Sequence, residues 1–142
     1  MVKKTFLVLI CFIGLIIFVS TLYGQGSKKT ITLPSGEVVW DLNGKWEVFT
    51  ENYGEWNQYG SYSTIVEITQ KGSSFVAVRM TDNPWYKKGS VLMRGKLDKN
   101  GVKEAEAVFH FGDFNMKGQI LDNGNKMIFD DGEKVRVTYT RK

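Results

Sequence analysis

Glycines recur at regular intervals through the second half of this 142-residue sequence. After Gly89 they stand 12, 11, 12 and 8 positions apart, at Gly101, Gly112, Gly124 and Gly132. Turns about 8–12 residues apart, separated by segments rich in β-branched and aromatic residues, are typical of an antiparallel sandwich or barrel. Helical periodicity is not sustained anywhere after residue 27. The chain is therefore predicted to be all-β and, at this length, to form one domain.

Eight segments with alternating or continuously apolar character are predicted as strands. Joined by short turns, they form an up-and-down antiparallel meander, and a meander hides its edges best by closing into a barrel of roughly eight strands. A barrel of this size is either filled by side chains or holds one small ligand. The predicted strands are 44–50, 63–70, 74–81, 89–97, 102–110, 114–121, 125–130 and 134–141.

Alternation also predicts which side chains point into the barrel. On the strand 74–81, Val76, Val78 and Met80 share one face. The predicted inward residues are bulky, which indicates a filled interior. They are Phe109, Phe111, Phe129, Tyr139, Met80, Met93, Met116 and Met127.

The first 26 residues have the layout of an export signal. Two lysines within the first four positions precede an apolar run of 14 residues, 6–19, and small residues follow at Gly24 and Gly26. Cleavage after residue 26 would place a domain of 116 residues in the periplasm or outside the cell. Extended to Tyr23, the apolar segment reaches 18 residues, close to the roughly 20 of a membrane span, so an uncleaved anchor is the alternative.

Composition limits the function classes once this segment is set aside. It contains Cys11, the only cysteine, and two lysines, so the remainder has 17 basic and 15 acidic residues and no disulfide. A charge of +2 does not suggest a nucleic-acid partner, and membrane contact is expected only through an uncleaved N-terminal segment. Residues 27–40 are expected to form an irregular arm with a turn at 34–36, before a barrel domain over 41–142.

The tripeptide Gly44-Lys45-Trp46 opens the first predicted strand. In this motif the chain resembles the lipocalin and calycin group, and in Ile68-Thr69-Gln70-Lys71-Gly72 it is similar to small exported lipocalin-like domains. The resemblance implies a lipocalin-like barrel in which Gly44 and Trp46 form a structural motif and Trp46 plugs the closed end. It also implies a basic side chain from a late strand over this tryptophan, a part that Arg136 or Arg141 could play. The group usually has a helix after the last strand, which this sequence lacks.

Aromatic residues gather in two long connections. Successive connections of an up-and-down barrel alternate between its ends, so 51–62 and 82–88 share one end, opposite Trp46. Tyrosine and tryptophan offer apolar area with a polar group, and loops on a rigid scaffold commonly bind ligands. Two interpretations remain open, a binding mouth with exposed Trp56 and Trp85 or a cap folded over the core. The candidate ligand-binding residues are Tyr53, Trp56, Tyr59, Trp85 and Tyr86, with Tyr62 beside them.

Catalytic, cofactor and metal sites have little support in the sequence. His110 and Asp113 could form a base and its orienting carboxylate, and Glu51 and Glu55 could mimic a glycosidase pair. No nucleophile motif, phosphate-binding loop or metal-ligand set accompanies them. The acidic segments 122–125 and 130–133 fit hairpin turns better than calcium loops. The protein is therefore expected not to be an enzyme and to need no cofactor or metal.

Two functions fit these observations. The first is a non-enzymatic exported protein that binds a small apolar or amphipathic molecule in the barrel or at its mouth, which a hollow interior would favour. The second is a cell-envelope interaction domain that binds a protein or glycan through the aromatic loops, over a filled barrel.

Overall fold

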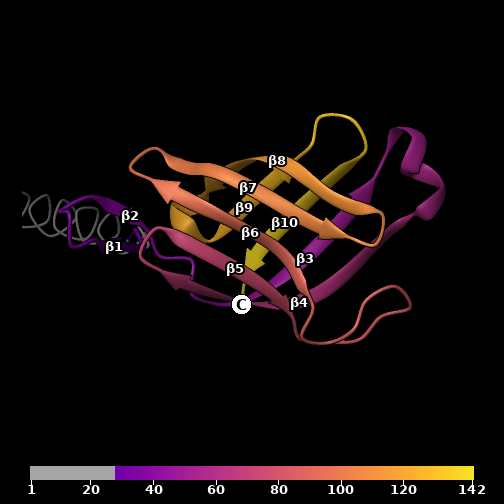
Figure 1. Cartoon of the computed structure of the whole chain (residues 1–142), viewed down its shortest axis with the longest axis horizontal. Coiled ribbons are helices and arrows are strands. Elements are labelled where there is room, and N and C mark those ends of the chain that lie inside the picture. The colour runs from indigo at the N-terminus through magenta and orange to yellow at the C-terminus, as the bar shows by residue number, and fades with distance from the viewer. Residues whose placement is uncertain (1–27) are drawn as a thin grey trace, which may run out of the picture.

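The computed structural model describes residues 28–142, so the predicted export segment lies outside the described residues. Eight antiparallel strands form a closed barrel in which each strand pairs with its neighbours in sequence and β10 pairs with β3 to complete the circle (Figure 1). The predicted all-β, up-and-down barrel is confirmed. The strands are β3 (Gly44–Asn52), β4 (Ser61–Lys71), β5 (Ser74–Arg79), β6 (Val91–Asp98), β7 (Gly101–Phe109), β8 (Gly112–Leu121), β9 (Lys126–Asp130) and β10 (Val135–Arg141).

The N-terminal arm is more regular than predicted. β1 (Thr30–Thr32) and β2 (Val38–Trp40) form an antiparallel hairpin whose turn contains Gly36, with φ of 86°. A side chain would strain this left-handed conformation, which glycine adopts freely. A strand of three residues is too short to show a clear alternation of apolar and polar side chains, so the sequence predicted only the turn. Within residues 28–142 no helix is long and apolar enough to cross a membrane.

Side chains pack the barrel interior. The rings of Trp46, Tyr139, Phe129 and Phe75 follow one another with centroids 6.4, 5.4 and 6.4 Å apart. Six of the eight predicted inward residues are buried, and two predictions are wrong. Phe111 lies in the β7–β8 turn and is 56% exposed, and Met80 follows the end of β5 and is only partly buried.

The orientation of β5 is opposite to the one predicted. Residues 75–78 are all apolar, so alternation alone cannot identify the inner face. In the barrel Phe75 and Ala77 are buried while Val76 is 37% exposed. The aromatic ring of Phe75 packs against Phe129 in the core. This register also directs Arg79 inward, where only 1% of its surface is exposed.

Trp46 lies buried at the end of the barrel where β3 begins. It is fully buried, and its indole Nε1 donates a hydrogen bond to the carbonyl of Leu42 at 2.9 Å. The guanidinium of Arg141 lies 4.3 Å from the centre of the Trp46 ring. It also donates to the carbonyls of Asp41 at 2.6 Å, Asn43 at 2.8 Å and Gly124 at 3.2 Å. Of the two candidate basic residues, Arg141 therefore closes this end.

We expect Arg141→Met to lower the free energy of unfolding by about 2 kcal/mol, because it removes charge-assisted hydrogen bonds to three carbonyls. The matched control is Arg136→Met. Arg136 forms an ion pair with Asp130 at 2.8 Å, and its side chain is 52% exposed, so about 1 kcal/mol or less should be lost. Urea unfolding of both variants measures the difference. Equal losses would contradict the assignment of Arg141 to the closed end.

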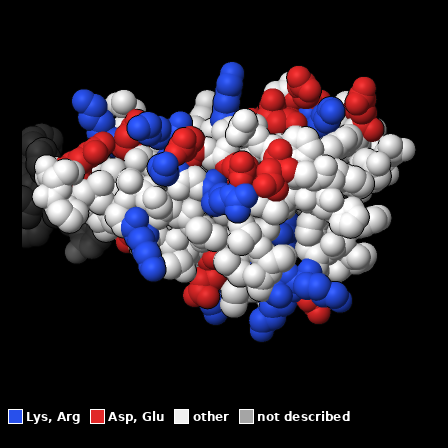
Figure 2. Space-filling model, in the orientation of Figure 1, with Lys and Arg blue, Asp and Glu red and all other residues white. Residues whose placement is uncertain are grey.

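Charged side chains of both signs are interspersed over the barrel wall (Figure 2). On β6 and β7, Lys96 pairs with Glu104 at 2.8 Å and Arg94 pairs with Glu106 at 2.7 Å. Arg94 also contacts Asp113 at 3.0 Å. These exposed pairs contribute little stability individually, but they leave no single-sign patch on this part of the wall.

Candidate functional site

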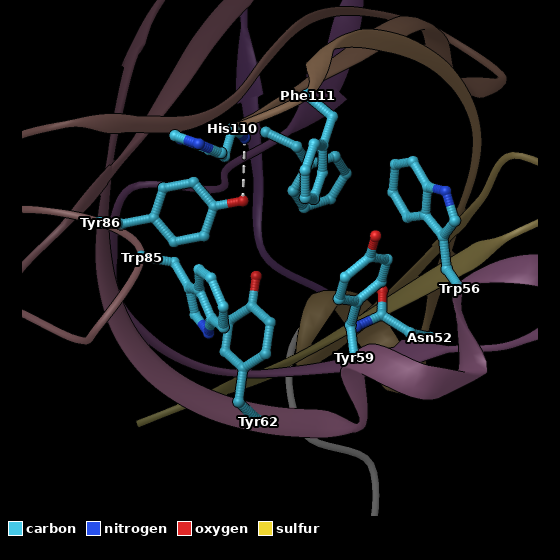
Figure 3. A pocket seen from close by; sticks show the side chains of 9 residues that line it. Asn52, Trp56, Tyr59, Tyr62, Trp85, Tyr86, His110 and Phe111 are labelled. Atoms are coloured by element: carbon cyan, nitrogen blue, oxygen red, sulfur yellow. Dashed lines mark hydrogen bonds between the residues drawn. The ribbon is translucent and has the colours of Figure 1, made fainter.

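An aromatic pocket opens at the end of the barrel opposite Trp46. It is shallow: its cavity volume is about 30 Å³, and about 430 Å³ of empty space lies between its walls when the part open to solvent is included. Its walls come from the connections 51–62 and 82–88 and from the end of β7 with its turn, and the rings surround a common opening (Figure 3). Trp56 and Trp85 therefore line the same pocket at one end of the barrel, the end to which the alternation of connections assigned both loops. The lining residues are Asn52, Trp56, Tyr59, Tyr62, Trp85, Tyr86, Phe109, His110 and Phe111.

The connection between β3 and β4 forms a short 3₁₀ helix, η1 (Gly54–Tyr59), which carries Trp56 and Tyr59. Gly54 is its first residue and Gly60 follows it, with φ of 56° and 67°. A Cβ at Gly54 would lie 2.7 Å from the carbonyl oxygen of Glu133, so this position also needs glycine for space. The Asn52 carboxamide closes the loop by donating to the carbonyl of Gly60 at 2.7 Å. These contacts hold the two aromatic side chains over the barrel.

The connection between β5 and β6 is organised by two short side chains. The carboxamide oxygen of Asn83 accepts hydrogen bonds from the backbone N–H groups of Trp85 at 2.9 Å and Tyr86 at 2.8 Å. The carboxylate of Asp82 accepts from the N–H of Lys88 at 2.6 Å. Asparagine and aspartate commonly build turns in this way. The Tyr86 hydroxyl accepts from the N–H of His110 at 3.1 Å, which ties this loop to the β7–β8 turn (Figure 3).

The two tryptophans of the mouth have different environments. Trp56 is partly buried and packs edge-on against Phe109 and Phe114, with centroids 6.3 and 5.0 Å away. Trp85 is 57% exposed. The proposed cap and the proposed lip therefore coexist, because Trp56 covers the core and Trp85 stands at the rim.

The pocket wall carries tyrosine hydroxyls among apolar rings. Tyr62 and Tyr86 lie with their ring centroids 6.4 Å apart. Burial raises the pKa of Tyr62 to about 12, so its hydroxyl stays neutral and able to donate at pH 7. A molecule in this pocket would meet apolar surface together with a few hydrogen-bonding groups, the usual composition of a small-molecule site.

Tyr53 is the one predicted binding residue that does not line the pocket. Its hydroxyl donates to the carboxylate of Asp130 at 2.6 Å, beside the β9–β10 turn. Burial favours the neutral form of Asp130. The hydrogen bonds from Tyr53, Gly132 and Arg136 outweigh this effect and hold its pKa below the ordinary value. Tyr53 therefore fastens the loop to the barrel wall. Turn alternation identified the correct end but not the direction of the side chain.

Three acidic residues of the alternative chemical sites make structural contacts. Asp113, the proposed partner of His110, forms an ion pair with Arg94. Glu55 lies 3.8 Å from Lys134, with 84% of its side chain exposed. The carboxylate of Asp131 accepts backbone N–H groups from residues 133–135. Among the described residues 28–142, no cluster of three or more His, Cys, Asp or Glu could hold a metal ion.

Four pocket residues were not among the ligand-binding residues predicted from the sequence, and of these His110 was considered only as a catalytic base: Asn52, Phe109, His110 and Phe111. The last three stand at the end of β7 and in the short turn that follows, at the same end of the barrel as the two long connections. Turn alternation therefore contained the signal for them. The prediction named residues of the two longer connections instead, because those connections hold more aromatic residues.

Comparison of the chain with models of known protein families, with curated proteins and with solved structures found no match.

Proposed function

We propose that this chain is a non-enzymatic, exported binding protein that holds a small apolar or amphipathic molecule at the mouth of its barrel. The aromatic pocket at that end carries the proposal, because it joins apolar rings from three connections around one opening. The packed interior argues for the mouth rather than the depth of the barrel as the binding position.

The rim supports the same position. Trp85, Phe111 and Tyr59 are 57%, 56% and 43% exposed, although large apolar side chains gain free energy when they are removed from water. All three line the pocket, so a ligand seated there would cover them together.

We expect Trp85→Ala to weaken binding of the apolar fluorescent probe N-phenyl-1-naphthylamine by about tenfold or more, as for a binding hot spot. The free energy of unfolding should change by only about 0.5 kcal/mol, because Trp85 is largely exposed. Fluorescence titration and urea unfolding of the full chain measure the two quantities.

The matched control is Phe49→Ala. Phe49 is 44% exposed on β3 and does not line the pocket, so its loss should leave probe affinity unchanged. Absence of probe binding by the unmodified chain, or equal effects of both substitutions, would argue against a mouth site.

A second candidate is a cell-envelope interaction domain that binds a protein or glycan through the rim. The exposed aromatic trio over a packed barrel favours it. Native mass spectrometry of the protein purified from its own host separates the two candidates. A retained small molecule supports the first, whereas a bound protein or glycan chain supports the second.

Export is tested by the intact mass of the protein recovered from its host. We expect a chain that begins at Ser27, since the basic and apolar start of the sequence fits a cleaved signal. A full-length species extracted from the membrane would support the uncleaved anchor. A full-length cytosolic species would contradict export by either route.

A further inference from the structure

One part of the outer barrel wall carries a row of alternating charges. The row crosses four neighbouring strands, β3, β10, β9 and β8 (Figure 1). Glu51 on β3 pairs across the strands with Arg136 on β10. Arg136 pairs in turn with Asp130 on β9, which pairs with Lys117 on β8. Direct cross-strand partners point to the same face of a sheet, so the wall presents a negative, a positive, a negative and a positive side chain in that order.

The two ends of this row have no ion-pair partner within residues 28–142. In the middle, Arg136 and Asp130 form an ion pair at 2.8 Å. Glu51 and Lys117 are exposed, and none of the ion pairs among the described residues includes either of them. They stand three strands apart, about 14 Å at the usual strand spacing, so they cannot pair with each other in one chain. On the wall of β6 and β7, by contrast, opposite charges pair across the strands.

An uncharged row runs beside the charged one on the same four strands. Phe49 pairs with Thr138, and Ile128 pairs with both Thr138 and Gln119. Phe49 is 44% exposed, an unusual position for a large aromatic side chain on a barrel wall. The shorter side chains, Thr138 and Ile128, occupy the two middle strands. Because a barrel wall is convex, a second wall placed against it comes closest along this midline and needs longer side chains toward the outer strands.

A hollow lies along the charged row. It is open to solvent and has a volume of about 480 Å³. Two carboxylates, those of Glu51 and Asp130, belong to its lining, so a long cationic side chain from outside would meet opposite charge there. Lysine carries such a charge on a flexible four-carbon stem. The lining residues are Glu51, Tyr53, Asp130, Gly132 and Arg136.

We propose that this wall is the interface of a homodimer, in which two copies of the chain meet around a twofold axis that runs parallel to the strands between β9 and β10. A twofold interface uses the same patch on both subunits. The axis sets β3 of one copy opposite β8 of the other, and β10 opposite β9. Glu51 of each copy therefore meets Lys117 of the second copy, and Arg136 meets Asp130. Lys117 enters the hollow of the second copy.

The charges also determine the direction of the axis. Glu47 stands on β3, on the other side of the uncharged row from Glu51. An axis across the strands, centred on the uncharged row, would bring Glu51 of one copy against Glu47 of the other, and like charges at an interface are unfavourable. The parallel axis avoids this contact and keeps both barrel mouths toward the same side of the dimer. No side chain of the two rows lines the mouth pocket, so the inference goes beyond the proposed function and does not depend on it.

Sedimentation velocity of the full chain tests the interface. A contact across four strands is small for a protein interface, so we expect a monomer–dimer equilibrium with a dissociation constant in the micromolar range. Glu51→Lys and Lys117→Glu should each weaken dimerisation by about tenfold or more, because each substitution brings two pairs of like charges together. Both positions are exposed, so each variant should retain the fold.

Mixing the two variants gives an independent readout. In a dimer of one Glu51→Lys chain with one Lys117→Glu chain, opposite charges meet at both sides of the axis. We expect these chains to bind each other with about the affinity of the unmodified chain, and a chain that carries both substitutions should dimerise with itself. The matched control is Lys71→Glu. Lys71 is likewise exposed, at the end of β4 far from the charged row, so its reversal should leave dimerisation unchanged.

Each outcome decides the proposal. Recovery of the dimer in the mixture and in the double variant supports the pairing of Glu51 with Lys117. A chain that stays monomeric up to about 1 mM would overturn the dimer and leave this wall to a different partner. Dimers that neither substitution weakens would place the contact elsewhere, which also overturns the proposal. Weakening by both substitutions without recovery in the mixture would show that the two residues do not meet.

Discussion

Replacing Trp46 with alanine is expected to lower the free energy of unfolding by about 3–5 kcal/mol, the usual range for deleting a large buried aromatic side chain. Trp46 is fully buried and donates its indole N–H to Leu42. Its ring meets Tyr139 edge-on at 6.4 Å and lies under Arg141. The substitution therefore leaves a cavity, an unpaired carbonyl and an arginine without the ring beneath it.

Urea unfolding of the full chain, followed by far-ultraviolet circular dichroism, measures this loss. Trp85→Ala is the matched control, since it deletes the same side chain from an exposed position. Its midpoint should stay close to that of the unmodified chain. A loss below about 1 kcal/mol for Trp46→Ala would contradict the closed-end arrangement, because a buried residue of this size cannot be removed so cheaply.

Gly95→Ala is expected to cost about 3 kcal/mol, the upper part of the usual range for overpacking. Gly95 points into the barrel on β6, where the Phe75 ring covers it. An added Cβ would contact the carbonyl oxygen of Glu104 and would lie 2.8 Å from Cε1 of Phe75. The oxygen belongs to the backbone of β7, so relief requires the strands themselves to move.

Gly89→Ala is the control that separates the cost of steric crowding at Gly95 from the cost of backbone strain. Gly89 has a φ of 86°, but no atom lies within 4 Å of a Cβ placed there. Its substitution should cost about 1 kcal/mol through conformation alone. Thermal or urea unfolding compares the two variants. If Gly95→Ala proves no more costly than Gly89→Ala, the close contact between β6 and β7 is looser than the structure indicates.

The strands and their order could be predicted because local signals determine them. Glycine turns delimit each strand, and on β10 the buried Val135, Val137 and Tyr139 alternate with polar residues. Where both faces of a strand are apolar, as on β5, the sequence could not tell which face turns inward. That ambiguity concealed Arg79, because a basic residue after an apolar run is ordinarily assigned to the surface.

The sequence predicted at which end of the barrel the candidate site lies. It did not predict how the individual side chains of the site pack. Counting connections was sufficient to bring Trp56 and Trp85 to one end. It could not separate the covering role of Trp56 from the exposed position of Trp85, because that depends on packing against Phe109 and Phe114. The direction of Tyr53 likewise depends on Asp130, which lies 77 positions away in the sequence.

The pairing of β3 with β10 also determines when the barrel can form. Trp46 and Arg141 are partners in that ladder, 95 positions apart. At about 5–20 residues per second, synthesis of this interval takes about 5–20 s. Throughout that time one edge of β3 has no partner, and a chain that stops before β10 exposes two strand edges. Exposed edges are templates for pairing with other chains, so chains lacking β10 should aggregate rather than remain as monomers.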